Sequence, residues 1–411
     1  MWRPSFWLAL MAISAGCGTL PRDAVPPDRV AEARVAAMPP EVRGIGLDRS
    51  VALQDDFADA MVAGGVGQGC DRDKGNPVFC VLIISGGGGS GAYGAGLLNG
   101  WTASGSRPEF KIVTGVSTGG LIAPFAFLGP DWDGKLAEAY TSIEGDADVI
   151  TERSVLGILR NDSVATAEPF VERIAQYVDT AMLEAVAREH LSGRRLYIGT
   201  TNLDAQTFTV WNMGAIAAAG GAEALPLFRK VLLASASIPI LMPPVLFDVE
   251  VDGQPYDEMH ADGGVQAQFF VPLRVINLPE AIRDAQSRGF AYTPRPRMYV
   301  IRNARFTPEP DAVERRLPTI AKRTISSMIQ AMGRSDLYQI YAISRARGSD
   351  FHYTEVPPDF VWNADEEFDG AEMRRLFQIG VDAGRRGDAW RRRPPGLFAD
   401  NTEAAPAGSG N

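Results

Sequence analysis

The 411-residue chain has little histidine and little cysteine, and these scarcities exclude several kinds of site. It contains three histidines and three cysteines. None of them is grouped at the spacing of zinc ligands, so no metal or other cofactor is expected. Basic residues are outnumbered as well, and the net charge of −10 argues against a nucleic-acid partner. There is also no internal repeat and no second set of motifs, which indicates one catalytic domain.

The first 16 residues read as a signal peptide, with one arginine and a short apolar core. That core is too short to span a bilayer, which needs roughly 20 residues. Ser14-Ala15-Gly16-Cys17 resembles a bacterial lipobox, which implies that Cys17 becomes a lipidated N-terminus; the alternative is a secretory signal cleaved nearby. Because Gly18 carries no retention signal, we expect an exported protein that is lipid-anchored to the bacterial cell envelope at the outer membrane.

The segment that follows, residues 17–77, is rich in proline, alanine, glycine and aspartate and has only short apolar runs. It is interpreted as a tether and covering segment, with a helix expected over 50–61. Two cysteines remain, Cys70 and Cys80. In an exported protein, two cysteines ten residues apart are expected to form a disulfide, which would attach the tether to the start of the first core strand.

Glycine, unlike histidine, is abundant in this chain, and two turns are especially rich in it. The apolar, β-branched runs 81–84 and 111–114 predict buried strands. Each is followed by a glycine-rich turn, Gly86–Gly91 and Gly115–Gly119, and then by a helical pattern. The second turn has the G-x-S-x-G form of a nucleophile elbow, with Ser117 at its centre.

These residue types suit acyl transfer. A serine nucleophile must be exposed and deprotonated, and hydrogen-bond donors must stabilise the oxyanion that forms when it attacks. Gly115 and Gly119 remove side chains that would collide at a sharp turn, and Ser117 then stands at a helix N-terminus. The loop of Gly86, Gly87, Gly88 and Gly89 can turn several backbone N–H groups toward the same point. We therefore assign the oxyanion hole to this glycine loop.

Two other interpretations of the glycines remain open. Gly86, Gly88 and Gly91 also satisfy the G-x-G-x-x-G fingerprint of dinucleotide binding, but no acidic residue ends the next strand to hold a ribose. A phosphate-binding loop needs a lysine, and none occurs between Lys74 and Lys111. A glycine turn with a purely structural role is the second alternative.

The general base has two candidates. A Ser-His-Asp triad in the order typical of α/β-hydrolases leaves His352, which lies in an alternating run typical of an ordinary strand. The other candidate is Asp262, which is followed by two glycines and can reach a neighbouring loop from a turn. Its alternative role is a plain Asp-Gly hairpin turn.

Three motifs in this order resemble the patatin-like phospholipase family: Gly86–Gly91, Gly115–Gly119 and Asp262-Gly263-Gly264. The resemblance extends over residues 78–350. It implies a metal-independent acyl hydrolase of membrane lipids that uses a Ser117–Asp262 dyad and needs no histidine. The chain departs from the family at Ser90, where the family has a basic residue.

Strands that alternate with helices predict an α/β fold with a mostly parallel central sheet, which the family resemblance makes a three-layer sandwich. Helices are expected over 165–190, 318–345 and 372–390, the last two packing into the core or serving as a lid. The predicted organisation is a signal peptide (1–16), a lipid-anchored tether (17–77), a catalytic domain (78–350), a C-terminal helical extension (351–393) and a disordered tail (394–411).

The sequence therefore predicts a phospholipase or lysophospholipase that works on membrane lipids. Two alternatives use the same fold. Acyl transfer to an acceptor other than water would use the same residues, and a catalytically idle lipoprotein would only bind lipid or a partner. Ser90 is the feature that favours the idle protein.

Overall fold

The computed structural model describes residues 20–46, 49–64, 70, 78–158, 160–293, 295–308, 310 and 312–397. The predicted signal peptide, Cys17 and residues 398–411 of the predicted tail lie outside this part of the chain.

Within the described residues, the main sheet has ten strands. Five of them, in the order β7-β4-β3-β11-β12, are parallel, and the remainder add antiparallel pairs around β7. The strands are β1 (Arg34–Val35), β2 (Arg43–Ile45), β3 (Val78–Ile84), β4 (Ile112–Val116), β7 (Arg195–Asn202), β8 (Thr207–Asn212), β9 (Val245–Val251), β10 (Gln254–Asp262), β11 (Arg295–Arg302) and β12 (Asp350–Glu355), with a separate pair β5 (Thr151–Glu152) and β6 (Ala165–Thr166).

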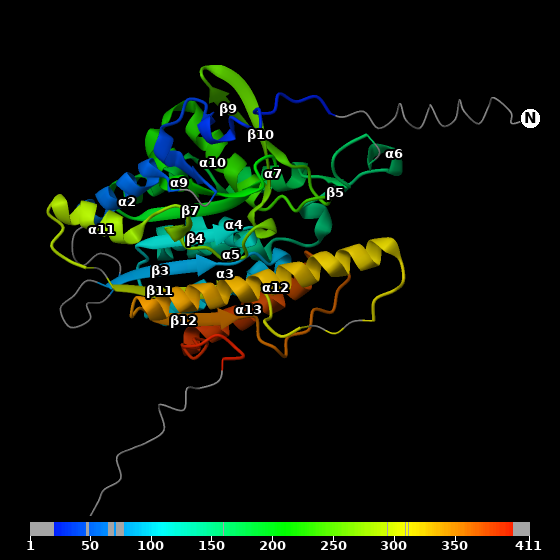
Figure 1. Ribbon diagram of the computed structural model, residues 1–411. Helices are drawn as coiled ribbons and strands as arrows, with labels where there is room; N and C mark the ends of the chain where they lie inside the picture. Colours follow the sequence, from blue (N-terminus) through cyan, green and yellow to red (C-terminus); the bar gives the residue numbers. More distant parts are fainter. Residues whose placement is uncertain are drawn as a thin grey trace, which may run out of the picture.

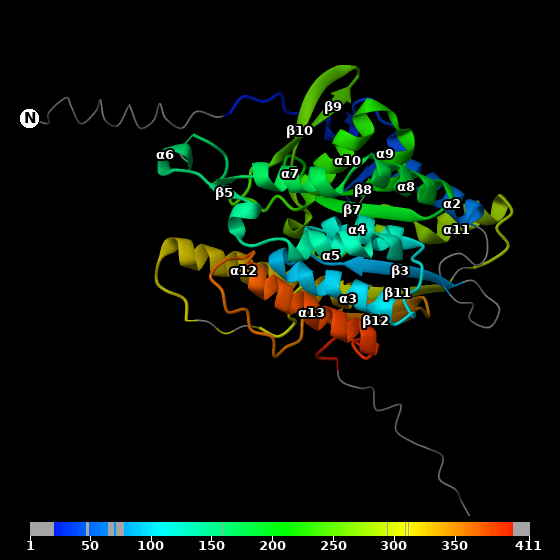
Figure 2. The same ribbon diagram turned by 180° about the vertical axis from the view of Figure 1, so that it is seen from behind.

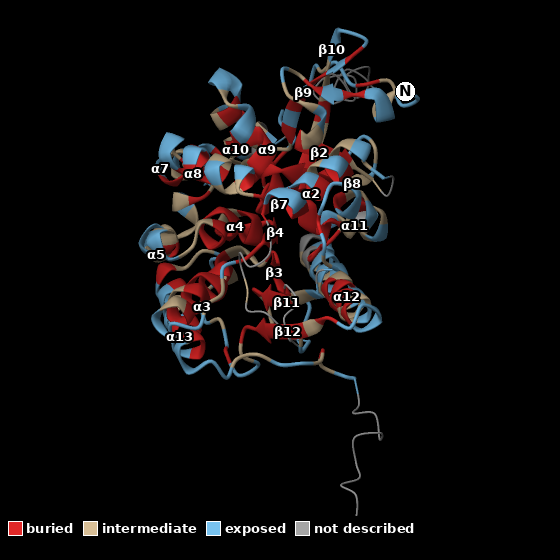
Figure 3. Cartoon of the chain, turned by 90° about the vertical axis from the view of Figure 1, so that its left-hand side faces the viewer, coloured by how far each residue is buried: buried red, intermediate tan, exposed pale blue. Residues whose placement is uncertain are grey.

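Helices cover both faces of this sheet, as the sequence predicts for an α/β sandwich (Figures 1 and 3). One layer holds α2 (Val51–Ala63), α11 (Leu278–Ser287) and α12 (Leu317–Ala346). The other holds α3 (Gly91–Ala103), α4 (Thr118–Leu128), α5 (Asp133–Thr141), α7 (Glu168–Tyr177), α8 (Thr180–Leu191), α9 (Met213–Ala219), α10 (Gly221–Ser235) and α13 (Gly370–Arg386); the short α6 (Val155–Ile158) lies outside the layers.

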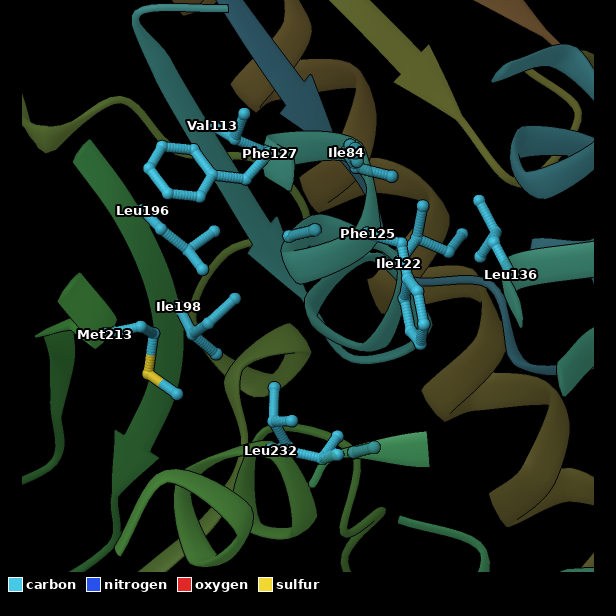
Figure 4. Packing of buried hydrophobic residues seen from close by; sticks show 14 of the residues in the cluster. Ile84, Val113, Ile122, Phe125, Phe127, Leu136, Leu196, Ile198, Met213 and Leu232 are labelled. Atoms are coloured by element: carbon cyan, nitrogen blue, oxygen red, sulfur yellow. The ribbon is translucent and has the colours of Figure 1, made fainter. Parts of the chain in front are cut away.

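The period of two along each strand creates these layers. In β3, Leu82 and Ile84 belong to the hydrophobic cluster under α3 and α4, whereas Val81 and Ile83 belong to the cluster under α2 and α12. The first cluster is seen at close range in Figure 4, where Ile122 and Phe125 of α4 pack over the sheet. Both faces of β3 are buried, which explains its continuous apolar sequence.

The described part of the predicted tether packs against the sheet. Strand β1 pairs with β9 and β2 pairs with β8. Near its beginning, Arg22 forms ion pairs with Asp204 and Asp257, each at 2.7 Å. Cys70 and Cys80 are joined by a disulfide, with their Cα atoms 5.5 Å apart, and so connect this region to β3.

Two sequence-based expectations about the elements are wrong. The single helix expected over 165–190 is two helices, α7 and α8, because the Asp179 side chain accepts a hydrogen bond from the Met182 N–H and so begins a new helix. The boundary expected at residue 350 also fails. Strand β12 extends the central sheet beside β11, so residues 350–386 belong to the same fold rather than to a separate extension.

Helices α3 and α13 pack unusually close, side by side in Figure 2. Glycines lie at the contact on both helices, Gly96 and Gly100 on α3 and Gly380 and Gly384 on α13. A Cβ atom at Gly100 would overlap the carbonyl oxygen of Val381. Since the glycine loop leads directly into α3, α13 holds the element that begins at the predicted oxyanion hole.

We expect Gly100→Ala to lower the free energy of unfolding by about 2 kcal/mol, because the added methyl group forces the two helices apart. Gly134→Ala is the matched control, since it also lies in a helix but nothing stands within 4 Å of its Cβ position. That variant is expected to be neutral or slightly stabilising. Urea unfolding of both variants checks the prediction, and equal stability of Gly100→Ala and the parent protein would contradict it.

Candidate active site

Ser117 lies in the turn between β4 and α4, in a conformation that side chains rarely adopt. Its φ of 55° and ψ of −130° place it outside the favoured regions. Close backbone packing requires glycine at both flanking positions. A Cβ at Gly115 would overlap the Gly119 carbonyl, and a Cβ at Gly119 would overlap the Ile84 carbonyl. The G-x-S-x-G pattern is thus a strained strand-to-helix turn at this position.

Strand β7 brings Ser117 and Asp262 together. Strand β8 pairs with one edge of β7. On the other edge, β4 pairs with the first part of β7 and β10 pairs with its last residues, so the ends of β4 and β10 meet. Val116 pairs with Gly199, and Asp262 pairs with the next residue, Thr200. Consequently the residue that follows β4 meets the residue that ends β10.

The side chains of these two residues interact directly. The Ser117 hydroxyl lies beside the Asp262 carboxylate and favours its ionised form. The carboxylate also accepts a hydrogen bond from the Gly264 N–H at 2.6 Å. Both residues are buried, with 8% and 5% of their surface exposed. Burial raises the pKa of Asp262 to about 6, although both of these interactions lower it. A carboxylate with this pKa can accept a proton near neutral pH.

The end of α10 fixes the backbone at both residues. The Ser235 hydroxyl accepts a hydrogen bond from the Ser117 N–H at 3.0 Å and donates one to the Gly199 carbonyl at 2.8 Å. Two residues later, the Ser237 carbonyl accepts the N–H of Asp262 at 2.9 Å. The sequence analysis gave neither Ser235 nor Ser237 a role.

The glycine loop lies against Ser117. A Cβ built on Gly86 would stand 3.0 Å from the Ser117 Cβ and 3.6 Å from its Oγ. Gly88 has a φ of +53° and contacts the Glu367 side chain on the outside of the loop. Gly89 and Ser90 belong to the short turn Gly88–Ser90, which leads directly into α3. The loop therefore stands where an oxyanion formed at Ser117 would need donors.

Asn303, which sequence reasoning missed, holds this loop to the sheet. It is completely buried directly after β11. Its side-chain amide donates to the Ser85 carbonyl at 2.9 Å, and its side-chain oxygen accepts the Gly94 N–H at 3.1 Å. Its own N–H donates to the Ser85 hydroxyl at 2.9 Å. The only signal in the sequence is its place at the carboxyl end of a predicted strand.

A cavity of about 100 Å³ opens beside Ser117 and Gly88. Its walls come mainly from α4, α7 and the segment after α10, and most of them are apolar. The lining includes Leu121, Phe125, Ile143, Phe170, Ile174, Leu241, Met242 and Met373. Such a space fits a hydrocarbon chain next to the serine hydroxyl.

The three histidines all lie in the described part of the chain, and none reaches Ser117. In the sheet, His352 of β12 pairs with Tyr299 of β11, which pairs with Leu82 of β3, which in turn pairs with Val113 of β4. His352 is therefore three strands away from β4 and level with Val113, well before Ser117. It stacks on Tyr299 with ring centroids 4.5 Å apart, and burial lowers its pKa to about 4. His260 is enclosed by Thr200 and Glu258, and His190 lies beside Asp56. The triad alternative through His352 has no geometric basis.

Two wider features complete the description. Within the described residues, no group of three or more histidine, cysteine, aspartate or glutamate side chains is placed to hold a metal ion. In the same part of the chain, no helix is both long enough and apolar enough to cross a membrane.

Comparison with known proteins gives one family and a distant structural neighbour. A sequence model of the family described as patatin-like phospholipase matches residues 82–274, which contain all three motifs. Comparison with curated proteins gives no significant match. Among solved structures, VipD from Legionella pneumophila has 11% sequence identity and a TM-score of 0.38, over 80% of this chain and 71% of that chain. The family match shows a patatin-like phospholipase domain over residues 82–274 of this chain.

Proposed function

We propose that the protein hydrolyses acyl esters of membrane phospholipids or lysophospholipids, with Ser117 as nucleophile and Asp262 as base. The patatin-like phospholipase domain over residues 82–274 supports lipid acyl hydrolase activity in general. The observation that carries the specific assignment is the strained Ser117, whose hydroxyl lies beside a buried carboxylate. The apolar cavity beside it supports an acyl chain as the group that is bound.

The proposed reaction runs in two halves. Ser117 Oγ attacks the ester carbonyl carbon while its proton passes to Asp262, and N–H groups of the Gly86–Gly89 loop stabilise the oxyanion. The intermediate collapses to an acyl-serine, and the leaving alcohol takes the proton from Asp262. Water then attacks the acyl-serine, gives its proton to Asp262 and releases the fatty acid, after which Ser117 is protonated again.

We also propose that the protein is exported and held at the outer membrane through a lipid on Cys17. The disulfide between Cys70 and Cys80 supports export, because such bonds persist mainly in oxidising compartments. Intact-mass measurement of the mature protein is expected to show a chain that begins at Cys17 and carries acyl groups. A mature N-terminus at any other residue would contradict the anchor.

Ser117→Ala and Asp262→Asn are each expected to lower turnover of phospholipid by roughly 10³-fold or more with the fold retained, because each removes one partner of the proton transfer. A fluorophosphonate probe should label the parent protein and leave Ser117→Ala unlabelled. The exposed Ser106→Ala is the serine control, and His352→Gln tests the triad; both should keep nearly full activity. An unlabelled parent protein would instead favour the idle lipoprotein.

The pH dependence follows from the base. Because burial raises the pKa of Asp262 to about 6, the carboxylate is protonated below that pH and cannot accept the Ser117 proton. We expect kcat/KM for a soluble short-chain ester to rise roughly tenfold per pH unit below pH 6 and to level off above it. Circular dichroism across the same range serves as the control for folding. A rate that stays constant down to pH 4.5 would exclude Asp262 as the base.

A further inference from the structure

The beginning of α12 exposes large apolar side chains to solvent. We call residues 317–329 the helix tip. Leu317 is 82% exposed and Met328 is 62% exposed, and Ile320, Ile325 and Ile329 are also exposed. Soluble surfaces carry single apolar residues routinely, but a group on one helix end marks an interaction site.

This exposure results from the direction in which the apolar residues face. In the second half of α12, Leu337 and Ile340 are buried against the sheet. Met328 precedes Leu337 by nine residues, which is two and a half turns of an α-helix, so it points to the opposite side. Leu317 precedes Leu337 by twenty residues, about five and a half turns, so it also points away from the protein. Ile329 precedes Ile340 by eleven residues, about three turns, so it shares the buried side and is exposed because the tip extends past the sheet.

The tip also extends past the sheet at the edge that carries the active site. Helix α12 ends shortly before β12 begins, so it runs antiparallel to the parallel strands and its N-terminus lies at their carboxyl ends (Figure 1). Gln330 contacts Arg302, the last residue of β11, which places the tip beyond the end of that strand. With 30 residues, α12 is about 45 Å long, and an eight-residue strand spans only about 26 Å.

The charge around the tip is opposite to that of the whole protein. The segment 312–335 contains five basic residues and one acidic residue, in a chain whose net charge is −10. Arg315 and Arg316 immediately precede the helix, and both are exposed. Apolar side chains flanked by cations suit a surface that is apolar inside and anionic outside.

Contacts connect the tip to the catalytic region. Seven residues after the end of the tip, in the same helix, the Asp336 carboxylate accepts a hydrogen bond from the N–H of Gln268 at 2.8 Å. The Gln268 side chain donates to the Gly264 carbonyl at 3.0 Å, next to Asp262. A hollow of about 410 Å³ runs along the tip between Val313 and Met328. A surface that receives the tip would thus meet the protein on the side of Ser117.

We propose that the helix tip is a membrane-docking element that inserts Leu317, Ile320 and Met328 into the interface of a bilayer with anionic headgroups. This docking proposal rests on the proposed function only for the choice of a lipid bilayer as the surface, since docking itself requires no hydrolysis. The docked tip orients the carboxyl edge of the sheet, and with it the cavity at Ser117, toward the lipid.

Vesicle flotation of the full-length chain tests this proposal. All proteins carry Ser117→Ala, so that lipid is not consumed during the measurement, and Cys17→Ser, so that no lipid anchor floats them independently of the tip. With vesicles of equal phosphatidylglycerol and phosphatidylcholine, Leu317→Asp/Met328→Asp is expected to bind at least roughly tenfold more weakly than the parent. Vesicles of phosphatidylcholine alone should bind the parent more weakly than the anionic vesicles do.

The control is Leu191→Asp, which charges a residue that is 72% exposed. Leu191 ends α8 just before β7 begins, at the opposite edge of the sheet, so this control should float like the parent. Equal flotation of the tip variant and the parent overturns the proposal. Light scattering that shows a parent dimer and a monomeric tip variant also overturns it, in favour of a second copy as the occupant.

Activity separates this inference from the proposed function. In chains that keep Ser117, the tip variant should hydrolyse a soluble short-chain ester as fast as the parent and lose turnover only on vesicles. A parent that floats through its tip but hydrolyses no ester refutes the hydrolase and leaves the docking element standing. Loss of soluble-ester activity in the tip variant refutes a role confined to docking.

Discussion

One edge of β7 brings Ser117 and Asp262 together. Two strands of opposite direction, β4 and β10, end against adjacent residues of that edge, Gly199 and Thr200. Backbone hydrogen bonds fix both ends, and Ser235 adds a bond to the nucleophile's own N–H. The carboxylate and the hydroxyl are therefore held by the sheet rather than by flexible loops, which is how a scaffold limits the reorganisation that a proton transfer requires.

The same arrangement removes Asp262 from water, and this loss of solvation raises its pKa more than the Ser117 hydroxyl and the Gly264 N–H together lower it. An exposed aspartate would be ionised but weakly basic, because its pKa lies near 3.9. With a pKa of about 6, Asp262 remains ionised at neutral pH and is a stronger base. In the proposed dyad, burial would supply the basicity that a histidine provides in a triad, so the proposed reaction needs none of the three histidines.

The sequence predicted local features well and long-range ones poorly. Ser117 and its glycines follow from one contiguous turn, and the strands before it follow from their apolar runs. Asn303 was missed because its partner Ser85 lies 218 residues away, and only the adjacency of β11 and β3 brings them together. The exposed tip of α12 was missed for another reason: periodicity shows where apolar residues lie around a helix, but not which side a neighbouring element covers or over what length.

With the lipid proposed on Cys17, the ion pairs of Arg22 would limit how far the protein can stand from a bilayer. Asp204 follows the carboxyl end of β7, so Arg22 is fixed at the same edge of the sheet as Ser117 and Asp262. Arg22 lies five positions after Cys17, and a fully extended segment of that length reaches about 18 Å. An anchor at that position would therefore keep this edge of the sheet near the membrane.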